Sequence, residues 1–293
     1  MSREDNRRRF ETEPLFPLAE IAKQPLAKKF KAPGLPVWTD SKARLIERYL
    51  HYFVLVTRHG TYIDGFAGPQ YLDVDEYAAK LVLERELERD PPRLRHFHLV
   101  DVGNPQVDLL RQLQAGSTAR DVRIYHGDFN EVVDQILQPS VLRPSEATFC
   151  LLDQRTFECH WDTVCKLAAY RATGYKIELF YFLANGWLER ALAALQDHHK
   201  CQAWWGRDDW QRVVQMTRGP RAEAMRKRFQ TELGYRFVMM WAIYEAKETN
   251  RIMYYMIHAS DHPEAPKLME RAYTDTVRGQ GGRQLKIALP EPP

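Results

Sequence analysis

The residues best suited to ligand chemistry are acids that follow short apolar segments, beginning with Tyr62-Ile63-Asp64-Gly65-Phe66-Ala67-Gly68-Pro69. Glycines let a backbone approach a ligand closely, and Asp64 can accept hydrogen bonds from an ammonium group or from turn amides. Any tight turn after a strand uses glycine, so a lone Gly-x-x-Gly is weak evidence. Because the acid and both glycines end an apolar strand here, we interpret the turn as a ligand site formed by Asp64, Gly65, Phe66 and Gly68.

Two further acids have the same position relative to an apolar segment. Asp101 can accept both hydroxyls of a ribose, with an exposed strand-end carboxylate as the simpler alternative. Asp128 either accepts from the amino group of an adenine or caps the helix that follows it. Phe129 could stack on the purine ring. Three acids along one edge are more specific than any one of them.

The fourth strand end carries the residues that would face a substrate. Asp153 could orient or deprotonate a nucleophile, and Gln154 could hydrogen-bond the substrate edge. The alternative for Asp153 is a purely local role in its loop. After the fifth strand, Asn185 and Trp187 could complete the same pocket, although Trp187 fits a core position equally well.

Alternating strands and helices must position these residues. A helix over Lys42–Thr57, capped by Thr39-Asp40-Ser41, precedes five strand–helix repeats. The predicted strands are Gly60–Phe66, Leu94–Asp101, Val122–His126, Ala147–Asp153 and Ile177–Ala184. The predicted helices are Asp75–Arg89, Gln106–Gln114, Asn130–Leu137 and Trp161–Thr173. Strands without polar alternation favour a parallel sheet covered on both faces.

The chain ends differently from its middle. Strands Phe237–Glu245 and Arg251–Ala259 are separated by five residues, too few for a crossover helix, so they form an antiparallel hairpin. The prediction is an α/β fold: a Rossmann-like, doubly wound, mostly parallel seven-stranded sheet with a C-terminal antiparallel hairpin, of the class I methyltransferase type. This connectivity argues against a nicotinamide dehydrogenase.

Composition divides the chain into an ordinary globular body and two flanks. Residues 1–38 are predicted to form a proline-rich arm, 39–278 the methyltransferase-like domain with a helical insertion at about 200–234, and 279–293 a flexible tail. The net charge of +3 is too small to argue for nucleic acid by itself. Four cysteines without metal-site spacing, and no apolar leader, predict a cytoplasmic protein without a metal.

From Lys42 to Ala272 the chain resembles the three-Cys-motif partner proteins, bacterial proteins predicted to be class I methyltransferases. The resemblance rests on the Asp64 turn, on Cys150-Leu151-Leu152-Asp153, on Trp161 and on Tyr254-Tyr255-Met256-Ile257-His258-Ala259-Ser260. It implies S-adenosylmethionine as cofactor, contacted by Asp64, Gly65, Gly68, Asp101 and Asp128. It also implies an iron–sulfur partner that carries the three-cysteine motif, and it names no methyl acceptor.

One departure keeps a second reading open. Asp153-Gln154-Arg155-Thr156-Phe157 lacks the proline found after this strand in many relatives and in nucleic-acid amino-methyltransferases. The nucleophilic cysteine needed for cytosine-ring methylation is also missing. The alternative to a methyltransferase is therefore an accessory, nucleic-acid-processing or nucleic-acid-binding protein on the same fold.

Nucleic acid is a candidate acceptor because aromatic and cationic residues alternate between Trp204 and Arg228. Such a surface could stack bases and neutralise phosphates. In the alternative reading, the tryptophans pack the helical insertion onto the sheet, and Arg226-Lys227-Arg228 is the solvated face of a helix.

Overall fold

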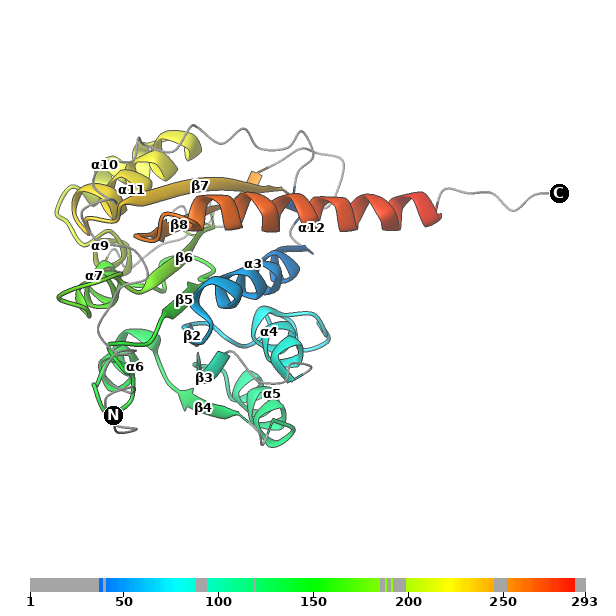
Figure 1. The fold of residues 1–293 in the computed structure, drawn as a ribbon. Coiled ribbons are helices and arrows are strands. Elements are labelled where there is room, and N and C mark those ends of the chain that lie inside the picture. The colour runs from blue at the N-terminus through cyan, green and yellow to red at the C-terminus, as the bar shows by residue number, and fades with distance from the viewer. Residues whose placement is uncertain are drawn as a thin grey trace, which may run out of the picture. The chain divides into compact units, whose positions relative to one another are not determined.

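The computed structural model describes residues 37–38, 41–87, 94–117, 120–184, 188, 191, 199–244 and 252–287. Its sheet has the strand order β1-β7-β8-β6-β5-β2-β3-β4, and β8 runs antiparallel to both of its neighbours while all other neighbours are parallel (Figure 1). The strands are β1 (Val37–Trp38), β2 (Gly60–Asp64), β3 (Leu94–Asp101), β4 (Asp121–His126), β5 (Thr148–Leu152), β6 (Glu178–Leu183), β7 (Phe237–Tyr244) and β8 (Ile252–Ser260).

This topology confirms the predicted fold class. The chain proceeds from β2 through β3 to β4 at one edge, then returns to β5 on the other side of β2. The hairpin of β7 and β8 completes the sheet in the class I methyltransferase arrangement. All seven predicted strands are present, with ends that differ by two residues at most. The eighth strand, β1, was not predicted because two residues are too short to show a pattern.

Helices cover both faces of the sheet. Figure 1 shows α3, α4, α5 and α12 on one face, and α6, α7 and α9 on the other. The helices are α3 (Lys42–Thr57), α4 (Ala78–Leu87), α5 (Asn104–Ala115), α6 (Phe129–Ile136), α7 (Trp161–Ala169), α9 (His199–Trp205), α10 (Trp210–Gln215), α11 (Arg218–Thr231) and α12 (Ala265–Ile287). This two-sided cover explains why every residue of β2, β5 and β6 is buried.

Helix α3 has the predicted bounds and shows how the sequence forms it. The buried side chains Leu45, Ile46, Tyr49 and Phe53 recur at helical spacing and face the sheet. The helix ends at Thr57 and is capped by Arg58, which has a φ of 66° and donates its backbone N–H to the carbonyl of residue 54 at 3.0 Å. That left-handed residue turns the chain directly into β2.

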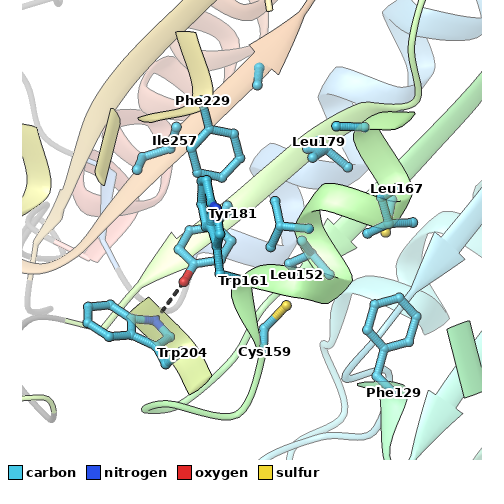
Figure 2. Packing of buried hydrophobic residues seen from close by; sticks show 14 of the residues in the cluster. Phe129, Leu152, Cys159, Trp161, Leu167, Leu179, Tyr181, Trp204, Phe229 and Ile257 are labelled. Carbon is cyan, nitrogen blue, oxygen red and sulfur yellow. Dashed lines mark hydrogen bonds between the residues drawn. The ribbon is translucent and has the colours of Figure 1, made fainter. Parts of the chain in front are cut away.

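The segment assigned to a helical insertion folds into α9, α10 and α11, and three of its aromatic residues, Trp204, Trp205 and Phe229, are core residues. Trp204 is 1% exposed, and its indole Nε1 donates to Tyr181 Oη of β6 at 2.7 Å (Figure 2). Trp161 packs edge-on against Phe229 of α11 with ring centroids 5.4 Å apart. The tryptophans therefore join the insertion to the sheet, as the packing alternative anticipated.

Two arginines of the same segment are also used internally. The guanidinium carbon of Arg228 lies 3.8 Å from the ring centroid of Trp161 and 4.3 Å from that of Trp205. Its Nε and Nη2 donate to the two carboxylate oxygens of Glu232 at 2.6 and 2.8 Å. Arg221 is 2% exposed and donates to carbonyls at the end of α10. These side chains are occupied within the protein, so a nucleic-acid acceptor stays an untested prediction.

Replacing Arg228 with lysine should lower the free energy of unfolding by about 1–2 kcal/mol. Lysine keeps the charge but cannot hold Glu232 with two hydrogen bonds or stack flat between two indoles. Urea denaturation followed by circular dichroism measures the change. Arg111→Lys is the control, because Arg111 pairs with Asp108 on the exposed side of α5 at 3.1 Å, where ion pairs contribute about 0–1 kcal/mol. Equal effects of the two substitutions would contradict the prediction.

A second set of polar side chains is buried at the amino end of β6. Glu178 accepts hydrogen bonds from Ser260 Oγ at 2.6 Å, from His258 Nε2 at 3.0 Å and from the hydroxyl of Tyr49. Burial by itself would raise the pKa of Glu178, but these hydrogen bonds and the nearby histidine hold that pKa below its usual range. We call these four residues the Glu178 cluster; it connects α3, β6 and β8.

The structure describes only two residues of the predicted N-terminal arm and part of the predicted C-terminal tail. Residues 1–36 of the predicted arm lie outside the described residues, and Val37–Trp38 form β1. The predicted flexible tail was 279–293, but helix α12 includes its first part and ends at Ile287. Among the described helices, none combines the length and the apolar character that a bilayer crossing requires.

Candidate functional site

Three of the four predicted strand-end acids, Asp64, Asp101 and Asp153, lie at the carboxyl ends of three neighbouring strands, β2, β3 and β5. β2 is the topological switch point, because the chain leaves it towards β3 and later returns to β5. Asp64 pairs in register with Leu151 of β5, two residues before Asp153, and Gly65 N donates to the Leu151 carbonyl at 3.0 Å. In open α/β sheets the crevice at such a switch point is the usual place for a ligand.

Asp64 is the most deeply buried acid of this crevice. Its side chain is 1% exposed and accepts a hydrogen bond from Tyr62 Oη at 2.7 Å and from Phe66 N at 3.1 Å. Burial raises the pKa of Asp64 from 3.8 to about 7, although both hydrogen bonds lower it, and the carboxylates of Asp153 and Asp101 raise it further. A buried carboxylate with raised pKa gains most from a ligand that brings a positive charge.

Asp101 holds the glycine turn in place. Its two carboxylate oxygens accept from Gly68 N at 3.0 Å and from Gly103 N at 2.8 Å. A methyl group on Gly68 would lie 2.4 Å from the Cβ of Gln106 and 2.7 Å from Asp101 Oδ2. The turn therefore needs glycine to approach Asp101, and the carboxylate keeps lone pairs for a further donor such as a ribose hydroxyl.

Asp128 and Phe129 have structural partners. Asp128 Oδ1 accepts from Asn130 N at 2.8 Å, so it caps α6, as the helix-cap alternative anticipated. Phe129 is 1% exposed and lies beneath the turn, where a methyl group on Gly65 would meet its ring at 2.8 Å. Phe129 thus has no exposed face for a purine, contrary to the stacking role we assigned to it. Phe66 lies half-buried beside it, with ring centroids 6.1 Å apart.

Replacing Gly65 with alanine should destabilise the protein by about 1–3 kcal/mol, the usual cost of overpacking. The added methyl group would push the Phe129 ring out of its place in the core. Differential scanning calorimetry measures the change. Gly219→Ala is the control: it lies in α11 with nothing within 4 Å of the added carbon, so helix propensity should leave the protein equally or slightly more stable.

Asp153 forms an ion pair that the sequence analysis did not anticipate. Lys42 Nζ, from the first residue of α3, donates to Asp153 Oδ1 at 2.7 Å. The same nitrogen lies 4.8 Å from the ring centroid of Phe182 and 4.6 Å from that of Tyr254. Burial by itself would lower the pKa of Lys42, but Asp153, Tyr254 and Asp64 together outweigh it and the pKa is raised. Lys42 is therefore a permanent cation beside the acid that we assigned to catalysis.

Gln154 faces inward rather than towards a substrate. It is 1% exposed, and its Oε1 accepts from Cys159 N at 3.0 Å, which folds the loop after β5 back on itself. The role of Gln154 that the structure supports is thus a brace for the loop that carries Asp153. Asn185 and Trp187 lie outside the described residues.

Sequence reasoning missed Lys42, Tyr62, Phe182 and Tyr254. A signal existed for Tyr62, because residues two apart on a strand share a face and Asp64 needs a donor there. No local signal pointed to Lys42, since only the tertiary fold brings the start of α3 to the end of β5. The four residues come from four different elements.

Comparison with known proteins gives distant structural likenesses. No family model matches the chain, and no curated protein does. Protein LPL1258 from Legionella pneumophila has 12% identity and a TM-score of 0.45, with 82% of this chain and 92% of that one covered. TYW2 from M. jannaschii, solved in complex with AdoMet, has 10% identity and a TM-score of 0.40, with 75% of each chain covered.

The CurJ carbon methyltransferase is similar at 10% identity and a TM-score of 0.43; the match covers 73% of this chain and 54% of that one. This chain thus spans about half the length of that protein. At such identities and TM-scores, the function has to be argued from the site.

Proposed function

We propose that the protein is an S-adenosylmethionine-dependent methyltransferase. The observation that carries this proposal is the buried carboxylate of Asp64 at the switch point, whose pKa burial raises to about 7, with Asp101 on one neighbouring strand and Asp153 beyond the other. S-adenosylmethionine carries an ammonium group, a sulfonium and a ribose diol. Asp64 would hold the ammonium group, Asp101 the ribose hydroxyls, and the Gly65–Gly68 turn would let the methionine portion approach the backbone.

The three carboxylates also suit the reaction. When the methyl group leaves, the cofactor loses its positive charge and the acceptor gains one. Asp153 lies where it can stabilise that new charge or take a proton from the acceptor. Gln154 stays out of this step, because its side chain is buried against Cys159. The iron–sulfur partner remains a prediction that follows from the family resemblance.

Isothermal titration calorimetry with S-adenosylmethionine tests the first half of the proposal. Tritiated-methyl transfer from the bound cofactor into RNA, DNA and purified proteins tests the second half. Binding without transfer to any acceptor would favour an accessory protein on this fold, and an absence of binding would refute the enzyme.

The affinity for S-adenosylmethionine should depend on pH around 7. Asp64 must be ionised to pair with the ammonium group, and its pKa in the free protein is about 7. Below pH 7, the association constant should therefore fall by about tenfold per pH unit, and above pH 7 it should level off until the ammonium group of the cofactor loses its own proton. Titrations at pH 7 in buffers of different ionisation enthalpy should show release of about half a proton. An affinity that does not change between pH 6 and 8 would contradict this role of Asp64.

A further inference from the structure

The surroundings of Lys42 are those of a site for an organic cation. Two aromatic rings, Phe182 and Tyr254, lie within 5 Å of the ammonium nitrogen, and Asp153 lies at hydrogen-bond distance. Aromatic faces attract cations through their quadrupole, and this attraction is stronger where water is excluded. The cluster thus combines the two interactions that stabilise an alkylated ammonium group.

The position of the cluster relates it to the proposed reaction. Asp153 follows β5, Phe182 is near the end of β6, and Tyr254 is near the start of the antiparallel β8, so all three lie at the edge of the sheet that carries Asp64. The charge of Asp64 contributes to the raised pKa of Lys42. A group bound at this place would be beside the cofactor pocket and could receive its methyl group.

The pair is accessible from outside. The side chain of Lys42 is 18% exposed and that of Asp153 is 21% exposed. A lysine ammonium group is held by a flexible four-carbon stem, so it can leave such a position without a change in the backbone. The remaining aromatic rings and carboxylate would then face an incoming ligand.

We propose that Lys42 occupies the methyl-acceptor subsite, and that the acceptor is an aliphatic amine whose ammonium group takes the place of Lys42 Nζ. This inference rests on the proposed methyltransferase function and names its substrate class. The acceptor ammonium first loses one proton, which Asp153 accepts and then passes to solvent. The amine lone pair forms the new N–C bond to the methyl carbon, and the sulfonium C–S bond breaks with its electron pair staying on sulfur. The products are a neutral thioether, a methylated ammonium ion and one proton.

Cavity complementation tests the cation subsite without any cofactor. In Lys42→Ala, the side chain beyond Cβ is replaced by a space that matches n-propylammonium. We expect n-propylammonium chloride to raise the Tm of this variant by about 2–3 °C at tenfold above its Kd. Sodium chloride at equal ionic strength and neutral n-propanol should not produce this rise. A rise that is equal with n-propanol, or no rise with the amine, would overturn the inference.

Two control variants sharpen the experiment. Lys42→Met fills the space without a charge, so n-propylammonium should not stabilise it beyond the effect of salt. Lys80→Ala removes a surface lysine that pairs with Asp75, and it should not respond to the amine either. Because the experiment contains no S-adenosylmethionine, its result is independent of whether the cofactor binds.

A second measurement uses the unaltered protein and holds even if Lys42→Ala does not fold. With tritiated S-adenosylmethionine, we expect methyl transfer to n-butylamine at a rate at least about tenfold above that to n-butanol or n-butanethiol. Transfer to the alcohol or thiol in preference to the amine would overturn the inference while leaving the methyltransferase proposal intact. Loss of cofactor binding in calorimetry would instead refute the proposed function.

Discussion

Replacing Asp64 with asparagine should abolish binding of S-adenosylmethionine and at the same time stabilise the free protein at alkaline pH. The binding loss should be at least about 30-fold, because removing one partner of a buried charge pair costs about 2–5 kcal/mol. The gain in stability has a separate origin. A buried carboxylate whose pKa is raised from 3.8 to about 7 opposes folding in its charged form.

The sign of the pH dependence follows from the direction of this shift. Between pH 4 and 7 the folded protein binds more protons at Asp64 than the unfolded chain does, so wild-type stability falls as pH rises through this interval. The shift sets an upper limit of about 4 kcal/mol on the penalty at pH 8. The asparagine loses one hydrogen-bond acceptor, which offsets about 1 kcal/mol of the gain.

Thermal denaturation at pH 5 and pH 8 measures the effect on stability, and calorimetric titration measures the binding. At pH 8 the Tm of Asp64→Asn should exceed that of the wild type, and at pH 5 the two should be nearly equal. Asp73→Asn is the control, since Asp73 is exposed in the segment between β2 and α4. A variant that binds the cofactor with wild-type affinity would remove Asp64 from the proposed site.

Replacing Glu178 with alanine should reduce the free energy of unfolding by about 3–5 kcal/mol. The substitution leaves His258, Ser260 and Tyr49 buried without the acceptor that they share, and removal of one member of a buried charged cluster is costly for this reason. The pKa of Glu178 is lowered in the folded protein, so the contribution of the cluster is complete at neutral pH and is lost as pH falls below about 4.5.

Urea denaturation at pH 7 measures this effect. Glu84→Ala serves as the comparison, because Glu84 is an exposed residue paired with Lys80 one turn away in the same helix, and its loss should cost below about 1 kcal/mol. A Glu178→Ala variant within 1 kcal/mol of the wild type would show that the cluster is neutral for stability.

The sequence predicted those features of the fold that depend on local residue patterns. Apolar runs predicted β2, β5 and β6 because strands covered on both faces have no polar alternation. The five residues between the last two strands required a hairpin, and this connectivity fixed the fold class. The acids Asp64, Asp101, Asp128 and Asp153 were placed at one edge of the sheet because the carboxyl ends of parallel strands meet there.

The sequence did not predict which way single side chains point or which partners they contact. Phe129 and Gln154 follow strand ends, as ligand contacts do, yet both are turned into the core by the turns that precede them. Arg228 was read as part of a charge run, but two indoles and Glu232 enclose it. Lys42 is the opposite case: its partner Asp153 lies 111 residues away, and no local periodicity reports such a contact.

The short strand β1 affects the tendency of the protein to self-associate. It pairs in parallel with the last two residues of β7, Val37 with Ile243 and Trp38 with Tyr244. An uncovered strand edge presents free N–H and C=O groups that recruit strands from other molecules, and this is a common beginning of aggregation. A chain shortened to start at Lys42 would keep every acid of the crevice and still lose the cover over this end of β7. Self-association, rather than a fault in the site, would then be the first effect of the truncation.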